Sequence, residues 1–163
     1  MSKQALLILD RFCGRETHPI VSGTWSIFHD DAIEMPTLCI QIRAGAGIDL
    51  HEDTKKLSAE PSWEINVVSA DMKDSALQPG ARFAVPKGYD EQQGGFVTNF
   101  YYWAHEATEE NVIEILARNG KSLQVRLSGQ TIDINYHDGS KPPTHISVEM
   151  ELKYDPATMR SMS

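Results

Sequence analysis

The stretch VIEILARNGKSLQVRLSGQTIDINY, residues Val112 to Tyr136, decides the fold that the sequence predicts. Aliphatic and polar side chains alternate along most of it, which is the period-2 pattern of a half-buried β-strand. Two glycine-bearing segments, 118–120 and 128–131, interrupt the alternation where tight turns would fit. The stretch therefore predicts a three-strand antiparallel meander over residues 112–137.

The second turn of this meander is predicted at Ser128–Thr131. Gly129 occupies the first central position, which requires a positive φ in a type II′ hairpin. Such a turn pairs Leu127 with Ile132 on an apolar face and Arg126 with Asp133 on a polar face. The inward position of Ile134 and the outward position of Asp133 follow from the same register.

The first turn contains Asn119-Gly120, and two registers compete. A two-residue turn would place Glu114 opposite Val125 on the apolar face, which the alternation of side chains disfavours. A three-residue loop with a left-handed Gly120 in a bulge pairs Ile115 with Leu123 instead. We therefore predict the bulged turn.

Strand patterns continue outside the meander. Thr144–Tyr154 places Ile146, Val148, Met150 and Leu152 on one face, and shorter strand patterns cover 20–28, 37–44, 63–72, 81–85 and 96–105. The sequence predicts an all-β fold: an antiparallel β-sandwich, jelly-roll or Ig-like, or a barrel. A single domain is expected over 1–154, followed by a flexible tail over 155–163.

Composition limits the classes of partner. The 163 residues carry a formal net charge of −8, from 23 acids and 15 bases, and such a field repels nucleic-acid backbones. Two cysteines are too few for a disulfide scaffold. The N-terminal apolar run Ala5–Leu9 is shorter than a signal-peptide core or a membrane span. We expect a soluble cytoplasmic protein that binds neither nucleic acid nor membrane.

The segment 96–105 carries the only binding site that the residues themselves suggest. Its even-numbered positions look like a core face, so that the odd-numbered positions share the opposite face. Aromatic rings beside hydrogen-bonding groups suit a protein partner or a small cyclic or sugar ligand. The alternative is that these side chains lie beneath the loop 87–95 or a second layer of strands. The candidate ligand-binding residues are Asn99, Tyr101, Trp103 and His105.

Sequence signatures of catalysis are missing, since Gly-x-Ser-x-Gly, His-Glu-x-x-His and paired Cys-x-x-Cys do not occur. We therefore interpret the chain as a non-catalytic module that binds a partner or associates with copies of itself. No residue pattern identifies a cofactor.

A second hypothesis comes from a resemblance. Gly45, His51 and Asp53, followed by Gly80, Pro86, Gly88 and Glu91, resemble the two metal-binding motifs of the cupin family. Asp53 and Glu91 stand where those motifs have histidines. The resemblance implies a metal-dependent enzyme acting on a small molecule, with His51, Asp53, Glu91 and His105 as ligands.

Overall fold

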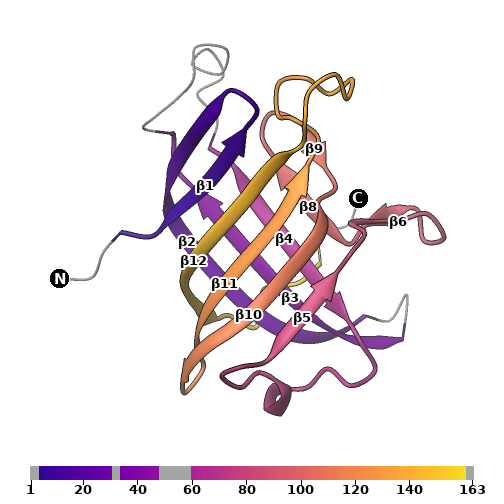
Figure 1. Cartoon of the computed structure of the whole chain (residues 1–163). Coiled ribbons are helices and arrows are strands. Elements are labelled where there is room, and N and C mark those ends of the chain that lie inside the picture. Colours follow the sequence, from indigo (N-terminus) through magenta and orange to yellow (C-terminus); the bar gives the residue numbers. More distant parts are fainter. Residues whose placement is uncertain (1–3, 31–33, 48–59, 161–163) are drawn as a thin grey trace.

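The computed structural model describes residues 4–30, 34–47 and 60–160 and confirms the all-β fold (Figure 1). One turn of 3-10 helix, η1, spans Asp74–Ala76. The strands are β1 (Leu6–Arg11), β2 (Gly14–Asp30), β3 (Met35–Ala44), β4 (Ser62–Val68), β5 (Arg82–Val85), β6 (Tyr89–Asp90), β7 (Gly95–Phe96), β8 (Thr98–Tyr101), β9 (His105–Glu106), β10 (Glu109–Asn119), β11 (Ser122–Thr131) and β12 (Thr144–Tyr154).

Ten of these strands form one sheet, in the order β5-β10-β11-β12-β1-β2-β3-β4-β8-β9, and β6 pairs with β7 separately. The described pairings are antiparallel except for a short parallel contact between the end of β12 and β2. The long strand β2 joins the two halves of the sheet, because it pairs first with β1 and then with β3. Figure 1 shows β10, β11 and β12 crossing in front of β2, β3 and β4, as two facing layers.

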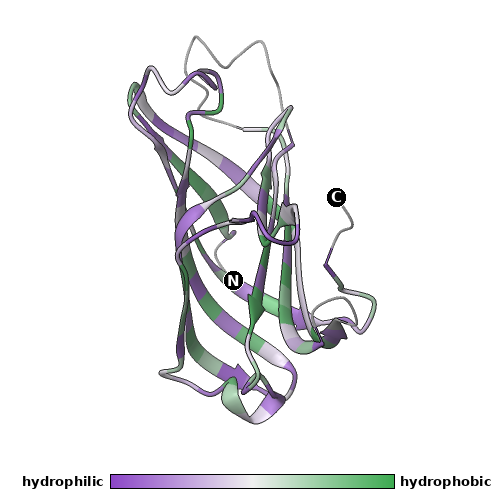
Figure 2. Cartoon of the chain, turned by 90° about the vertical axis from the view of Figure 1, so that its right-hand side faces the viewer, coloured by the Kyte–Doolittle hydropathy of each residue, from purple (hydrophilic) through white to green (hydrophobic). Residues whose placement is uncertain are grey.

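The core lies between these layers, where the inward side chains of the alternating strands meet. Figure 2 shows hydrophobic segments alternating with hydrophilic ones along the strands. Trp25, Trp63 and Phe100 are the largest apolar side chains that are fully buried. Trp25 donates its indole N–H to the Lys121 carbonyl at 2.8 Å, so its burial leaves no unpaired donor. The predicted strands 37–44 and 144–154 are confirmed as β3 and β12.

The third strand of the C-terminal meander is β12, and the predicted turn at Ser128–Thr131 is wrong. β11 runs straight through Gly129, which lies opposite Ile146 of β12. A Cβ at Gly129 would lie 2.5 Å from Asn111 Oδ1 and 3.1 Å from Trp63 Cζ2. Glycine is needed here because another part of the structure approaches the backbone closely, rather than for a turn.

The predicted strand 132–137 is a loop in the structure, so the pairs Leu127–Ile132 and Arg126–Asp133 do not form. Ile134 is buried as expected. Asp133, which we expected on the solvent face, is also buried, because Arg11 pairs with it. Chain geometry in this region is thus set by a buried ion pair rather than by a tight turn.

The first turn also differs from the prediction. Asn119 pairs with Ser122 around a two-residue loop with a left-handed Gly120, at φ 61°. The register shifts between Ile115 and Ala117, so that Ile115 pairs with Val125 and not with Leu123. The bulge lies inside the strand and keeps the aliphatic side chains on the inner face, which is the role we assigned to a bulge at the turn.

The chain after β12 lies along the outer face of β2 and β3. The Ser26 hydroxyl donates to the Thr158 carbonyl, Gln41 donates to the Met159 carbonyl at 2.8 Å, and the Thr158 side chain is buried. We expected a flexible tail over 155–163. Residues in 155–160 are hydrogen-bonded to the sheet. The mobility of this segment stays a prediction. Residues 161–163 lie outside the described residues.

Candidate functional site

The sequence predicted one long strand over the aromatic segment 96–105, and this prediction is wrong. β8 ends at Tyr101, the chain reverses, and β9 begins at His105, which pairs with Tyr101. The Tyr102 amide donates to the Ala104 carbonyl at 3.1 Å and closes the reversal. Trp103 lies at the tip of this hairpin, at the end of the sheet where β8 and β9 are the last strands.

The structure brings Asn99, Tyr101 and His105 together on the outer side of this hairpin, next in the chain to the tip that carries Trp103. Asn99 and His105 are in hydrogen-bond contact, with 2.9 Å between Nδ2 and Nδ1. The rings of Tyr101 and His105 have centroids 4.7 Å apart and are tilted by 45°. Tyr101 is 38% exposed and Trp103 is 60% exposed. Both aromatic side chains therefore face solvent rather than a second layer of strands.

Two further rings extend this group beyond the residues that the sequence indicated. Phe96 lies 6.5 Å from His105, centroid to centroid, and Tyr89 lies 5.5 Å from Phe96. Tyr89 and Phe96 belong to the paired strands β6 and β7. This short hairpin differs from the prediction, because we interpreted 87–95 as a loop. We call Tyr89, Phe96, Tyr101, Trp103 and His105 the aromatic surface.

Trp103 adopts a left-handed backbone conformation, with φ at 65°. For a bulky residue this is unusual and costs about 1–3 kcal/mol, so the surrounding structure must impose it. The preceding side chain supplies the restraint, because Tyr102 is buried among the core residues. Its hydroxyl donates to Glu16 Oε1 at 2.7 Å. The exposed Trp103 is thus held by an anchored neighbour.

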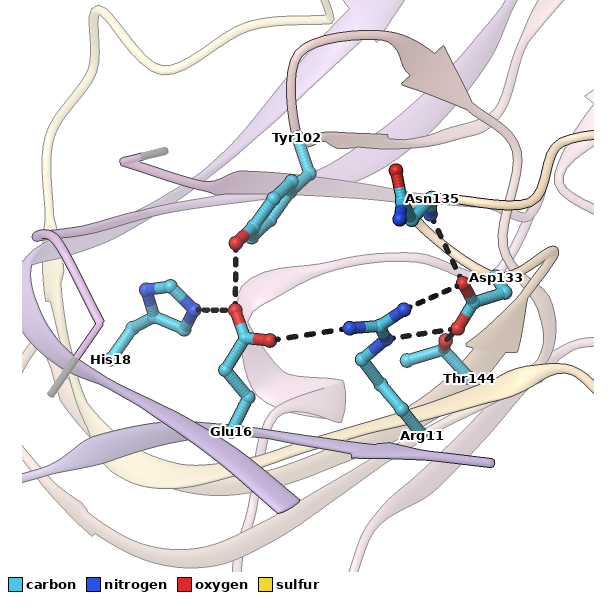
Figure 3. A network of polar contacts seen from close by, with 7 residues as sticks. All are labelled: Arg11, Glu16, His18, Tyr102, Asp133, Asn135 and Thr144. Carbon is cyan, nitrogen blue, oxygen red and sulfur yellow. Dashed lines mark hydrogen bonds and ion pairs between the residues drawn. The ribbon is translucent and has the colours of Figure 1, made fainter. Parts of the chain in front are cut away.

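Glu16 belongs to a buried polar network that sequence reasoning missed (Figure 3). His18 Nε2 lies 3.0 Å from Glu16 Oε1, and His18 Nδ1 lies 3.0 Å from the Gly45 carbonyl oxygen. Arg11 Nη1 lies 3.7 Å from Glu16 Oε2. From the sequence, 11–19 looks like a loop because it carries Gly14, His18 and Pro19. In the structure, these polar residues face inward from β1 and β2.

The other half of the network is a two-pronged ion pair between Arg11 and Asp133. Arg11 Nε and Nη2 donate to the two carboxylate oxygens of Asp133 at 3.0 and 2.9 Å. The Thr144 hydroxyl donates to Asp133 at 2.9 Å, and the backbone N–H of Asn135 donates to it at 3.1 Å. Burial favours the neutral acid, but these hydrogen bonds and the Arg11 charge outweigh it. The pKa of Asp133 is therefore lowered.

The contacts of His18 require one hydrogen between its Nε2 atom and Glu16 Oε1. The Gly45 carbonyl can only accept, so Nδ1 of His18 carries a hydrogen. Nε2 and Oε1 lie 3.0 Å apart and need one hydrogen between them, on either atom. Both side chains are at most 1% exposed. Because solvent does not reach this pair, the arrangement suits anchoring of the fold and of Tyr102 rather than turnover of a substrate.

The metal hypothesis gains no support from the described residues, among which no group of three His, Cys, Asp or Glu side chains could hold an ion. His51 and Asp53 lie outside the described residues. Glu91 is exposed in the turn between β6 and β7. His105 belongs to the aromatic surface and contacts Asn99.

The two cysteines do not form a disulfide. Burial raises the pKa of the Cys39 thiol, and the nearby Glu64 charge adds to this effect. A thiol of this kind is a poor nucleophile.

In the part of the chain that the structure describes, no helix is long and apolar enough to cross a membrane. Comparisons with family models, curated proteins and solved structures found nothing that matches this chain.

Proposed function

We propose that this chain is a non-catalytic binding module that recognises a protein partner through the aromatic surface. One observation carries the proposal: Trp103 is 60% exposed at a hairpin tip, in a backbone conformation that a buried neighbour restrains. Tryptophan and tyrosine dominate the energetically important contacts of protein interfaces. A backbone that is already ordered also loses little conformational entropy on binding.

The tilt of the rings favours a protein over a sugar polymer. Tyr101 and His105 are inclined by 45°, and Tyr89 and Phe96 by 80°, so the rings do not form one flat platform. An exposed indole at a hairpin tip suits a concave pocket on a partner better than a flat sugar-binding platform. A second copy of this chain is one such partner. A small cyclic or sugar ligand stacked on Trp103 alone is the alternative ligand.

The remaining properties of the chain are compatible with this proposal. A net charge of −8 favours a partner with a basic rim over a nucleic acid. Two cysteines that form no disulfide suit a reducing compartment, and we propose that the module is cytoplasmic.

The test is a selection of peptides from a displayed random library against the purified chain, followed by affinity measurements on variants. We expect peptides that bind the wild type to lose about tenfold or more in affinity for Trp103→Ala. Val21→Ala is the matched control, because Val21 is also an exposed apolar side chain, at 65%, and belongs to β2. Binding by these peptides that is equal for wild type and Trp103→Ala would contradict the proposal. A panel of soluble glycans tested in parallel covers the sugar alternative.

A further inference from the structure

A pocket of about 380 Å³ lies where the end of β4 approaches β5. β4 pairs with β8 only as far as Ile65, and β5 pairs with β10 on its other side. The last residues of β4 therefore reach β5 without an intervening strand, and the pocket occupies this seam. Its volume falls within the range of small-molecule sites in proteins.

The walls of this seam pocket are mainly apolar. Val67 and Val68 contribute from β4, Ala84 and Val85 from β5, and Met35 and Val97 from the neighbouring segments. Asn66, Asp90 and Arg160 supply polar groups to the same pocket. An apolar cavity with a few converging polar groups is the usual form of a small-molecule site.

Asn66 contains a buried acceptor that no described residue satisfies. Its Nδ2 donates to Glu64 Oε2 at 3.0 Å and to the Val97 carbonyl at 2.9 Å. Both partners are acceptors, which fixes the orientation of the amide. Its Oδ1 is buried and has no hydrogen-bond partner among the described residues. Unpaired buried acceptors are rare and costly in free energy, so a ligand group that donates a hydrogen bond to this oxygen would be stabilised.

We propose that the seam pocket binds a small, mainly apolar molecule that carries a hydroxyl or ammonium donor for Asn66 Oδ1. The apolar body would contact the valines, and a small displacement of the side chains that cover Asn66 would open the path to its oxygen. The Asp90 carboxylate lines the same pocket and accepts from the Gln92 amide at 2.9 Å. Two acceptors on the wall favour a donor on the ligand. The Arg160 guanidinium, which lines the same pocket, donates from Nε to the Phe96 carbonyl at 3.0 Å.

This proposal is independent of the aromatic surface, because Tyr101 and Trp103 are not among the residues that line the pocket. The probes are benzyl alcohol, benzylamine and toluene, which share an apolar ring and differ in the donor. The readout is the ¹H–¹⁵N spectrum of the full chain, in particular the Asn66 side-chain amide and the backbone amides of Val67 and Ala84.

We expect saturable shifts confined to the pocket, with the better of the two donor-bearing probes binding about fivefold to tenfold more tightly than toluene. Comparison of the alcohol with the amine identifies the donor. Ala84→Trp should abolish these shifts by filling the pocket from an exposed position on β5. Arg82→Trp, an exposed position two residues earlier on the same strand, should leave them unchanged.

Equal affinity for toluene and both donor-bearing probes would overturn the proposal, as would shifts that do not saturate or that persist in Ala84→Trp. Trp103→Ala should bind all three probes as the wild type does. Failure of the seam pocket is thereby distinguished from failure of the aromatic surface.

Discussion

The hydroxyl of Tyr102 lies 2.7 Å from Oε1 of Glu16, and this hydrogen bond joins the buried polar network to the hairpin that exposes Trp103. Tyr102 is the residue between the two exposed aromatic side chains of that hairpin. A contact deep in the protein thus anchors the residue next to a surface feature. The proposed binding surface depends on residues that a partner would never touch.

Tyr102→Phe removes only the hydroxyl and should lower the free energy of unfolding by about 1–2 kcal/mol, because Glu16 loses a donor in a buried site. It should also increase acrylamide quenching of tryptophan fluorescence, since Trp103 is the exposed indole among three. Tyr101→Phe is the matched control on the same hairpin and should change neither quantity appreciably. Quenching that is identical in wild type and Tyr102→Phe would argue against anchoring.

Asp133→Asn should destabilise the protein by about 3 kcal/mol, because it removes the charge that accepts two hydrogen bonds from the buried Arg11. Asp10→Asn is the control, since Asp10 also pairs with an arginine, Arg15, at 2.8 Å, but both side chains are largely exposed. That exposed pair should leave the urea midpoint almost unchanged. Equal effects of the two substitutions would show that burial does not govern how much each ion pair contributes to the free energy of unfolding.

The lowered pKa of Asp133 predicts a specific loss of stability in acid. The carboxyl titrates near pH 3.9 in the unfolded chain and below that value in the folded chain. The stabilisation is therefore complete above roughly pH 5 and is lost as the pH falls through the folded-state pKa. The difference in unfolding free energy between wild type and Asp133→Asn should be constant from about pH 5 to 7 and shrink below about pH 4. A difference that stays constant into acid would contradict the assignment.

Gly129→Ala should cost about 1–3 kcal/mol, because the new methyl group would overlap Asn111 Oδ1 at 2.5 Å. Asn111 is poorly able to move, since its amide donates to the carbonyls of Val85 and Thr108. Gly45→Ala is the control, because its nearest contact would be an ordinary 3.5 Å. Chemical denaturation of both variants measures the difference, and a neutral Gly129→Ala would disprove the close approach.

Cys39 should react with an aromatic disulfide reagent only when the protein unfolds. Its side chain is fully buried, and burial raises the pKa of its thiol. Cys13 is partly exposed and should react in the native state. One thiol titrated quickly in buffer and two in denaturant is the expected result. Rapid reaction of both in buffer would place Cys39 at the surface.

Regular alternation made much of the fold predictable. Ile146, Val148 and Leu152 recur at every second or fourth position, so β12 and its buried face could be predicted directly. The same reasoning placed Tyr101 and Trp103 on an outer face. It could not foresee the reversal between them, because tryptophan has no preference for a left-handed turn.

The failures have a common physical cause, which is contact between residues far apart in the chain. Gly129 resembles a turn residue until Trp63 and Asn111 are placed beside it. Glu16 and His18 resemble loop residues because their partners belong to other segments. Local patterns indicate which side chains are apolar, whereas inward-facing polar residues become intelligible only with their partners in place.

The hydrogen bonds of Ser26 and Gln41 to the segment after β12 bear on how this protein can be handled in the laboratory. A chain cut after Tyr154 would leave both donors to water and bare the outer side of β3. We therefore recommend that shortened versions retain residues 155–160, and that purification handles be placed beyond them.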